Sequence, residues 1–383
     1  MKDKLHIVNI VRDDKFIDNL IKFQDLSIDK CIHEYILVSK NNKSYKRIKA
    51  TDRIKIVSPH YILQYLKENE FHAVFLHSLV CMPYYLISQI HKGIPVFWFA
   101  WGFDMYGNLI NIKQLHHKSS ICRYSFFMKD LLKTFIQHLL QSILYSKPYT
   151  KMYQEAVGRI DYFSGVLPVE YDLAKKNANF RALQVEYYYC DVDALSENVT
   201  INENRGNILV GNSCDINNNH LDLLGYFNNV DLGERKIILP INYSGNAIYR
   251  KIVSSAYKKR FRDSVIVLEE YLPLDQYRNI VNSTSIGIFY HERQQAMGNI
   301  ELFLLNGGKL FLSKSSVIYK YLKTMGFVVF SIQDDLNTAQ LNEPLSNEQR
   351  LFNRERWLSL HNLEAELGKL NSLYILIENY DRE

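Results

Sequence analysis

Along the chain, short runs of β-branched and aromatic residues alternate with longer segments in which apolar residues recur every three or four positions. Short runs of the first kind are typical of buried strands, and the second spacing is typical of amphipathic helices. The first half predicts helices at 61–69 and 83–93, and it predicts strands at 5–11, 34–39, 53–58, 73–78 and 95–101. Strands that alternate with helices indicate parallel sheets, so we predict an α/β fold.

A second series of the same kind follows a polar stretch without periodicity at 191–206. Its expected helices cover 246–261, 274–284 and 299–308, and its expected strands cover 207–213, 236–243, 264–272, 286–291, 309–313 and 327–332. A chain of 383 residues is too long for one ordinary core. We therefore predict two domains, at 1–195 and 206–383, with closing helices at 346–362 and 363–380 that can cross back onto the first domain.

Composition narrows the class of protein. A hydrophobic content of 47% is that of a globular protein, and a net charge of +5 is too small to indicate nucleic-acid binding. The five cysteines show no CxxC or Cys/His spacing, which argues against a disulfide framework and against a zinc site. The first residues lack the features of a signal peptide, and no apolar run reaches the roughly 20 residues of a membrane span. We expect a cytoplasmic protein without a bound metal.

One basic segment, His116 to Tyr153, differs from the rest of the chain. It mixes aromatic and aliphatic residues with six cations, and Asp130 is the only acidic residue within it. A basic amphipathic segment suits the surface of an anionic membrane. An ordinary helix with a solvated basic side explains the same pattern. Both interpretations stay open at this point.

The loops that follow strands are the expected place for chemistry, because ligands of open α/β sheets bind at the carboxyl ends of the strands. Gly211, Asn212 and Ser213 follow one predicted strand, and His220 comes shortly after them. Glycine allows a sharp turn, and the next amides and the hydroxyl can face a phosphate at the start of a helix. The same residues are also ordinary turn and helix-capping residues.

A second loop places Arg293, Gln294, Gln295 and Gly298 just before a predicted helix that carries Glu301. Gly298 permits close approach of a diphosphate to the helix amides, and Arg293 supplies charge. Glu301 can accept hydrogen bonds from a ribose diol, although an acidic residue in the first turn also complements the helix dipole.

Two further strand ends carry candidates. Tyr243 can lie against a base or sugar, but tyrosine is so frequent in this chain that packing is an equal explanation. In the first half, Trp101, Asp104 and Tyr106 follow a strand, and His77 ends an earlier one. Asp104 is a candidate general base, since partial burial raises the pKa of a carboxyl group; a turn cap is the alternative. His77 can line the same site or have a structural role.

Together these segments resemble the TDP-N-acetylfucosamine:lipid II N-acetylfucosaminyltransferases, glycosyltransferase family 56. The resemblance runs in order through 75–78, 97–106, 208–220, 239–249, 271–277 and 289–308. It implies a GT-B fold, two Rossmann-like domains that face a central cleft, with the nucleotide sugar held mainly by the second domain. It also implies a lipid-linked acceptor in bacterial surface polysaccharide synthesis, such as enterobacterial common antigen, O-antigen or capsule.

The resemblance assigns residues to the two substrates. The donor side would comprise Gly211, Asn212, Ser213, His220, Tyr243, Arg293, Gln294, Gln295, Gly298 and Glu301. The acceptor side would comprise His77, Trp101 and Tyr106, with Asp104 as the catalytic base. GT-B enzymes generally need no metal, because helix termini and basic side chains stabilise the leaving diphosphate. The membrane interpretation of the basic segment gains weight, and we expect peripheral attachment at the cytoplasmic face of the inner membrane. A sugar-nucleotide epimerase of the same shape and a non-catalytic membrane-associated scaffold are the alternatives.

Overall fold

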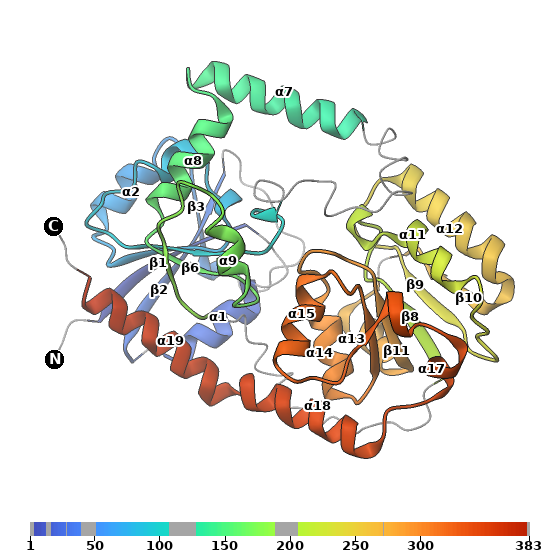
Figure 1. The fold of residues 1–383 in the computed structure, drawn as a ribbon. Helices are drawn as coiled ribbons and strands as arrows, with labels where there is room; N and C mark the ends of the chain where they lie inside the picture. The colour runs from blue at the N-terminus through green and yellow to red at the C-terminus, as the bar shows by residue number, and fades with distance from the viewer. Residues whose placement is uncertain are drawn as a thin grey trace. The chain divides into compact units, whose positions relative to one another are not determined.

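The computed structural model describes residues 4–12, 17–27, 29–39, 51–106, 128–187, 206–270 and 272–380. The chain divides into two compact units (Figure 1). The first unit comprises 1–109, 135–197 and 361–383, and the second comprises 110–134 and 198–360. The predicted linker at 191–206 lies outside the described residues, apart from Gly206.

The first unit contains a parallel sheet whose described strands lie in the order β3-β2-β1-β4-β5-β6-β7. Their bounds are β1 Leu5–Val11, β2 Cys31–Val38, β3 Ile54–Val57, β4 Ala73–Leu76, β5 Val96–Phe99, β6 Tyr162–Ser164 and β7 Leu183–Gln184. The central strands β4 and β5 are buried along their whole length, which explains their unbroken apolar sequences.

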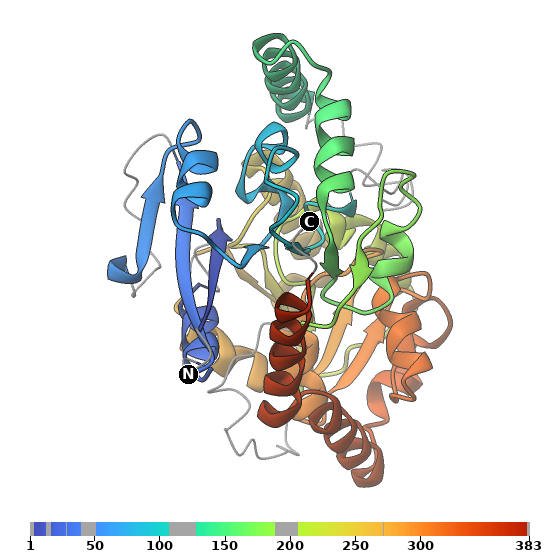
Figure 2. The same cartoon turned by 90° about the vertical axis from the view of Figure 1, so that its left-hand side faces the viewer.

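Helices of the first unit include α1 (Ile17–Asp25), α2 (Ile62–Glu68), α3 (Tyr84–Ile87), α8 (Tyr149–Arg159), α9 (Glu170–Ala174) and α19 (Leu363–Glu378). The C-terminal helix α19, drawn in dark red in Figures 1 and 2, adds Leu370, Leu373 and Ile377 to the core formed by β1 and α1. The end of the chain thus completes the unit in which the chain begins. The helix α7 (Met128–Leu144) spans the point where the two units divide.

The second unit contains another parallel sheet, in the order β10-β9-β8-β11-β12-β13. Its strands are β8 Asn207–Val210, β9 Ile237–Pro240, β10 Val265–Leu268, β11 Thr284–Phe289, β12 Lys309–Leu312 and β13 Phe330–Ser331. Its helices include α11 His220–Leu223, α12 Ala247–Phe261, α13 Leu274–Asn282, α14 Met297–Leu305, α15 Val317–Thr324, α16 Ile332–Asp335, α17 Thr338–Asn342 and α18 Asn347–Leu360.

The predicted α/β class is confirmed, and each strand expected from the sequence overlaps a described strand. The sequence analysis missed β6 and β7, which are only three and two residues long. Because all described pairs are parallel, the carboxyl ends of β8 and β11 lie at one edge of their sheet, and those of β4, β5 and β6 at one edge of theirs. None of the described helices is long and apolar enough to cross a membrane.

The docking of α19 depends on a buried hydroxyl, which gives a first prediction. The Tyr374 hydroxyl lies 2.7 Å from Ser27 Oγ and 2.9 Å from His33 Nε2. Tyr374→Phe leaves His33 Nε2 without this partner, while Ser27 Oγ keeps its bond to the carbonyl of Gln24. We therefore expect a loss of about 1–3 kcal/mol in the free energy of unfolding, seen as a lower melting temperature. Ser372→Ala, on an exposed part of the same helix, serves as the control. Equal melting temperatures of Tyr374→Phe and the wild type would contradict the assignment.

Candidate functional site

The loop after β8 is held in one conformation by its own side chains. Gly211 has φ +68°, and a Cβ there would lie 2.5 Å from His220 Cε1 and 2.8 Å from Asn218 Oδ1. The amide N–H of Asn212 donates to Asn218 Oδ1 at 3.1 Å, and Asn218 Nδ2 donates to Ser213 Oγ at 3.1 Å. The fold therefore requires glycine at 211, and Gly211, Asn212 and Ser213 form a tight turn as the sequence predicted.

His220 holds this loop through a hydrogen bond to its backbone. It is fully buried, and its Nε2 donates to the carbonyl of Ser213 at 2.8 Å. Burial lowers the pKa of His220 to about 4, so the ring is neutral at pH 7. Its Nδ1 is buried without a hydrogen-bond partner. With Nε2 engaged in the loop, His220 has a positioning role for Gly211 to Ser213.

The loop after β11 meets the loop after β8. Gln295 Nε2 donates to Asn212 Oδ1 at 3.1 Å, across 83 positions of sequence. The following helix α14 begins after Ala296, which has φ +62°, a conformation that non-glycine residues seldom adopt. Strained residues of this kind cluster at ligand sites. The structure thus brings together the two loops that the sequence singled out.

Polar atoms without partners gather at this junction. Arg293 Nε, Gln295 Oε1 and His291 Nε2 are all buried and make no hydrogen bond to the protein. Burial, with the nearby charge of Arg293, lowers the pKa of His291 to about 3, so His291 is neutral. Buried polar atoms are normally paired, so unpaired ones at a strand end are candidate contacts for a ligand or for water. Sequence reasoning missed His291, although it lies just after β11 and two residues before Arg293.

Gly298 differs from Gly211 in what the fold requires. It lies exposed in the first turn of α14, and a Cβ at this position would meet nothing within 4 Å. Neither strain nor packing explains glycine there. Close approach of an anion to the first amides of α14 stays the predicted reason for this glycine.

The other predicted donor residues lie around these loops. Gln294 is 7% exposed and already has protein partners. Glu301, on α14, accepts a hydrogen bond from Trp357 Nε1 of α18 at 3.2 Å, so one of its oxygens is engaged. The carbonyl of Tyr243 accepts from the Cys214 amide at 2.8 Å, which places the loop after β9 beside the loop after β8. The Tyr243 side chain is 42% exposed and has surface available for stacking.

On the first unit, Asp104 organises the loops after β4 and β5. Its Oδ2 accepts from the amide of Leu79 and from Trp98 Nε1, both at 2.8 Å, and its Oδ1 accepts from the amide of Trp101 at 3.0 Å. It is 1% exposed, and burial raises its pKa. These contacts support a positioning role. The role of general base stays a prediction, because a base must reach the acceptor hydroxyl.

Three predicted acceptor-side residues have different environments. His77 is buried, its Nε2 donates to Asn9 Oδ1 at 2.9 Å, and burial lowers its pKa to about 3. Tyr106 is 1% exposed. Trp101 is partly exposed and is the one of the three with surface for an acceptor. His77 therefore belongs to the polar core of the first unit.

Glu170 was missed by sequence reasoning and lies beside Asp104 and Tyr106. It starts α9 directly after the loop that follows β6, and it is fully buried. Its Oε2 accepts from the amide of Leu167 at 2.8 Å, it is hydrogen bonded to Tyr106, and its Oε1 has no partner. Burial raises the pKa of Glu170 to about 7. No sequence signal marks it, because its burial is a tertiary property.

This pKa predicts a pH dependence of stability. The folded protein binds the Glu170 proton more tightly than the unfolded chain, whose carboxyl has the ordinary pKa of 4.5. Stability should therefore fall as pH rises from 5 to 7 and level off above. Glu170→Gln cannot ionise, so the variant should gain on the wild type across this interval, by up to about 3 kcal/mol at pH 8. Melting curves from pH 5 to 8 measure it. A difference independent of pH would show that Glu170 does not titrate there.

Known structures with this fold include several glycosyltransferases. A glycosyltransferase from Rickettsia africae has a TM-score of 0.63 at 12% identity, with 99% of this chain and all of that chain covered. Sucrose-phosphate synthase from Thermosynechococcus elongatus has a TM-score of 0.66 at 10% identity, covering 99% and 100%. A lipopolysaccharide outer core galactosyltransferase has a TM-score of 0.60 at 12% identity, covering 97% and 99%. These similarities confirm the predicted GT-B fold.

The sequence itself identifies the family. The family described as 4-alpha-L-fucosyltransferase, glycosyl transferase group 56, matches residues 14–355, which includes both donor-side loops and the Trp101 to Tyr106 segment. Membership selects glycosyl transfer over an epimerase or a scaffold, and it implies a nucleotide-sugar donor and a glycan acceptor. The chain belongs to glycosyltransferase family 56 and is a glycosyltransferase.

Proposed function

We propose that this enzyme transfers a deoxyhexose, N-acetylfucosamine, from a nucleoside diphosphate to a polyprenyl-diphosphate-linked glycan in bacterial surface polysaccharide synthesis. The observation that carries the donor side is the hydrogen bond from Gln295 to Asn212, which joins the two loops at the carboxyl ends of β8 and β11. Unpartnered Arg293 Nε and Gln295 Oε1 lie in the same loop. The sugar is supported by the fucosyltransferase description of the family.

In the proposed reaction the acceptor hydroxyl oxygen forms a bond to the anomeric carbon, and the bond from that carbon to the diphosphate oxygen breaks. The hydroxyl proton passes to a base, and the diphosphate leaves with the bonding electron pair. Arg293 and the first amides of α14 are proposed to stabilise this developing charge, as basic side chains and helix termini can do without a metal. Glu301 is proposed to hold the ribose, and Tyr243 to stack on the base or sugar.

The acceptor side is proposed to lie at the carboxyl ends of β4, β5 and β6. Trp101 offers the exposed surface, while Asp104 and Tyr106 hold the loop from within. Among the described residues, no three His, Cys, Asp or Glu side chains gather as a metal site would require. The predicted participation of Asp104 as the base requires one of its hydrogen bonds to open.

The acceptor lipid is proposed to be reached at the membrane surface through α7. Seven apolar side chains at spacings of three and four are between 44% and 67% exposed: Leu132, Phe135, Ile136, Leu139, Leu140, Ile143 and Leu144. A stripe of this extent on one helix is unusual for a surface that faces only water. The segment around it carries six cations and one acidic residue, which suits anionic headgroups. The part of that segment at 116–127 lies outside the described residues.

Donor binding gives a prediction with matched variants. The wild type should be stabilised by TDP more than by UDP, GDP or CDP, by about 2.7 kcal/mol at 100 times the dissociation constant. Arg293→Ala should lose most of this stabilisation, because it removes the charge beside the diphosphate. Gly298→Ala should keep the melting temperature of the free protein, because the added Cβ meets no protein atom within 4 Å. It should lose the response to TDP, because the same Cβ would obstruct a diphosphate at the first amides of α14. Arg356→Ala, on the exposed side of α18, is the control.

Two results of this experiment would contradict the proposal in different ways. A full TDP response in Arg293→Ala would remove the phosphate role of the loop after β11. A response to another nucleotide alone would keep glycosyl transfer and discard N-acetylfucosamine as the donor sugar.

Membrane attachment is tested by sedimentation with phosphatidylglycerol vesicles. Ile143→Glu places a charge within the exposed stripe and should lower the partition coefficient at least about tenfold. Gln141→Glu adds the same charge to the opposite side of α7 and should have a much smaller effect. Equal losses in both variants would point to charge alone. A dimer that Ile143→Glu dissociates, measured by light scattering without lipid, would assign the stripe to a second copy of the chain.

A further inference from the structure

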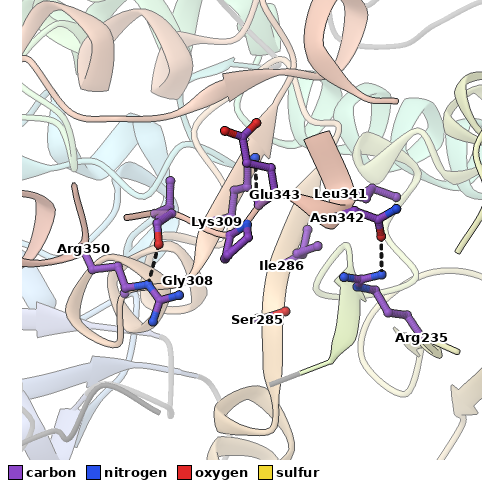
Figure 3. A pocket seen from close by; sticks show the side chains of 12 residues that line it. Arg235, Ser285, Ile286, Gly308, Lys309, Leu341, Asn342, Glu343 and Arg350 are labelled. Carbon is purple, nitrogen blue, oxygen red and sulfur yellow. Dashed lines mark hydrogen bonds between the residues drawn. The ribbon is translucent and has the colours of Figure 1, made fainter. Parts of the chain in front are cut away.

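A polar cavity lies in the second unit, at the amino ends of β11 and β12 (Figure 3). Its volume is about 220 Å³, and its lining includes Arg235, Ser285, Lys309, Glu343 and Arg350. The donor-side loops follow the carboxyl end of β11. That strand has six residues, so the cavity is separated from them by roughly 20 Å. A ligand in this cavity is therefore distinct from the donor diphosphate.

Positive charge dominates the lining. Three cationic side chains face one carboxylate, that of Glu343. Arg235 donates from Nη1 to Asn342 Oδ1 at 2.8 Å, and Arg350 donates from Nε to the carbonyl of Leu345 at 2.9 Å. Within the described part of the chain, neither guanidinium forms an ion pair. Both groups hold neutral oxygens with one nitrogen and keep further donors available for an anion.

Lys309 adds a buried charge. It is 4% exposed, and its Nζ donates to the carbonyl and side-chain oxygens of Gln340, both at 2.7 Å, and to the carbonyl of Glu343 at 2.9 Å. All three partners are neutral oxygens, and the carboxylates of Glu343 and Asp335 act on the ammonium charge without a direct hydrogen bond to it. A buried charge of this kind is costly unless an opposite charge compensates it. Lys309 holds the turn after α17 and adds positive electrostatic potential to the cavity.

Two features mark the cavity as a place for a ligand. Arg235 Nε is buried and has no hydrogen-bond partner. The pairing of β11 with β8 shifts register between Thr284 and Ile286, so Ser285 lies at an irregularity of the ladder beside the cavity. Figure 3 shows the guanidinium groups of Arg235 and Arg350 on either side of Ser285 and Ile286. Ladder irregularities are enriched next to functional sites.

We propose that this cavity binds a small oxyanion, a phosphate group, between Arg235 and Arg350. Planar guanidinium groups match the oxygens of phosphate in paired hydrogen bonds. The Ser285 hydroxyl lies between the two guanidinium groups as a further donor. Lys309 contributes positive charge to the lining. Inorganic phosphate and the phosphate of a small ester share this chemistry, and the size of the cavity admits either.

Titration of the full-length protein with inorganic phosphate at constant ionic strength tests the site, with glucose 6-phosphate as a second arm. We expect saturable binding that weakens at least about tenfold in Arg235→Gln and in Arg350→Gln. Arg356→Gln removes a charge from α18, the helix that carries Arg350, at a position outside the cavity. This variant should bind phosphate as the wild type does. Tighter binding of the ester than of phosphate would identify an ester as the ligand, and equal binding would identify inorganic phosphate.

The donor site supplies the internal control. Arg235→Gln and Arg350→Gln should retain the TDP response, whereas Arg293→Ala should retain phosphate binding at this cavity. Arg350→Lys keeps the charge without the planar fork and should show an intermediate affinity, which guards against a loss caused by misfolding. Phosphate binding that is unchanged in both glutamine variants, or absent from the wild type at 20 mM or so, would overturn the proposal. Failure of the TDP response alone would leave it standing.

Discussion

The donor-side loops depend on one strand pairing, that of β8 with β11, in which Val210 lies opposite Ile288. Because the two strands run parallel and end together, the turn at Gly211 and the loop before α14 emerge side by side, and Gln295 can reach Asn212. A shift of register by one residue would point the side chains of the strand to the other face of the sheet. The site is therefore fixed by the hydrophobic pattern of two short buried strands.

The polar groups at the strand ends of the two units differ in how far they are hydrogen bonded within the protein. In the second unit, Arg293 Nε and Gln295 Oε1 are left without partners, which suits a site that completes its hydrogen bonds with a ligand. In the first unit, Asp104 uses both oxygens to hold backbone and indole donors, and Glu170 is bonded to Tyr106. The arrangement in the second unit favours ligand binding. The arrangement in the first unit favours a rigid frame for the partly exposed Trp101.

The sequence was sufficient for the longer strands, for several amphipathic helices and for the turn at Gly211, because each depends on local periodicity or on turn residues. The expected helix at 246–261 is α12, Ala247–Phe261, and the closing segments are α18 and α19. Burial of single polar groups could not be predicted. Glu170 and His291 owe their pKa values to packing by distant segments, and His77 proved to be part of a core network with Asn9. Local sequence carries no record of such packing.

We propose that the loops after β8 and β11 together hold the diphosphate of a nucleotide sugar. A crystal structure of the enzyme with bound TDP measures this directly. We expect diphosphate oxygens within hydrogen-bond distance of the Arg293 guanidinium and of the first amides of α14, beside Gly298. A diphosphate bound elsewhere, with Arg293 and Gln295 making no contact to it, would show that these loops do not form the donor site.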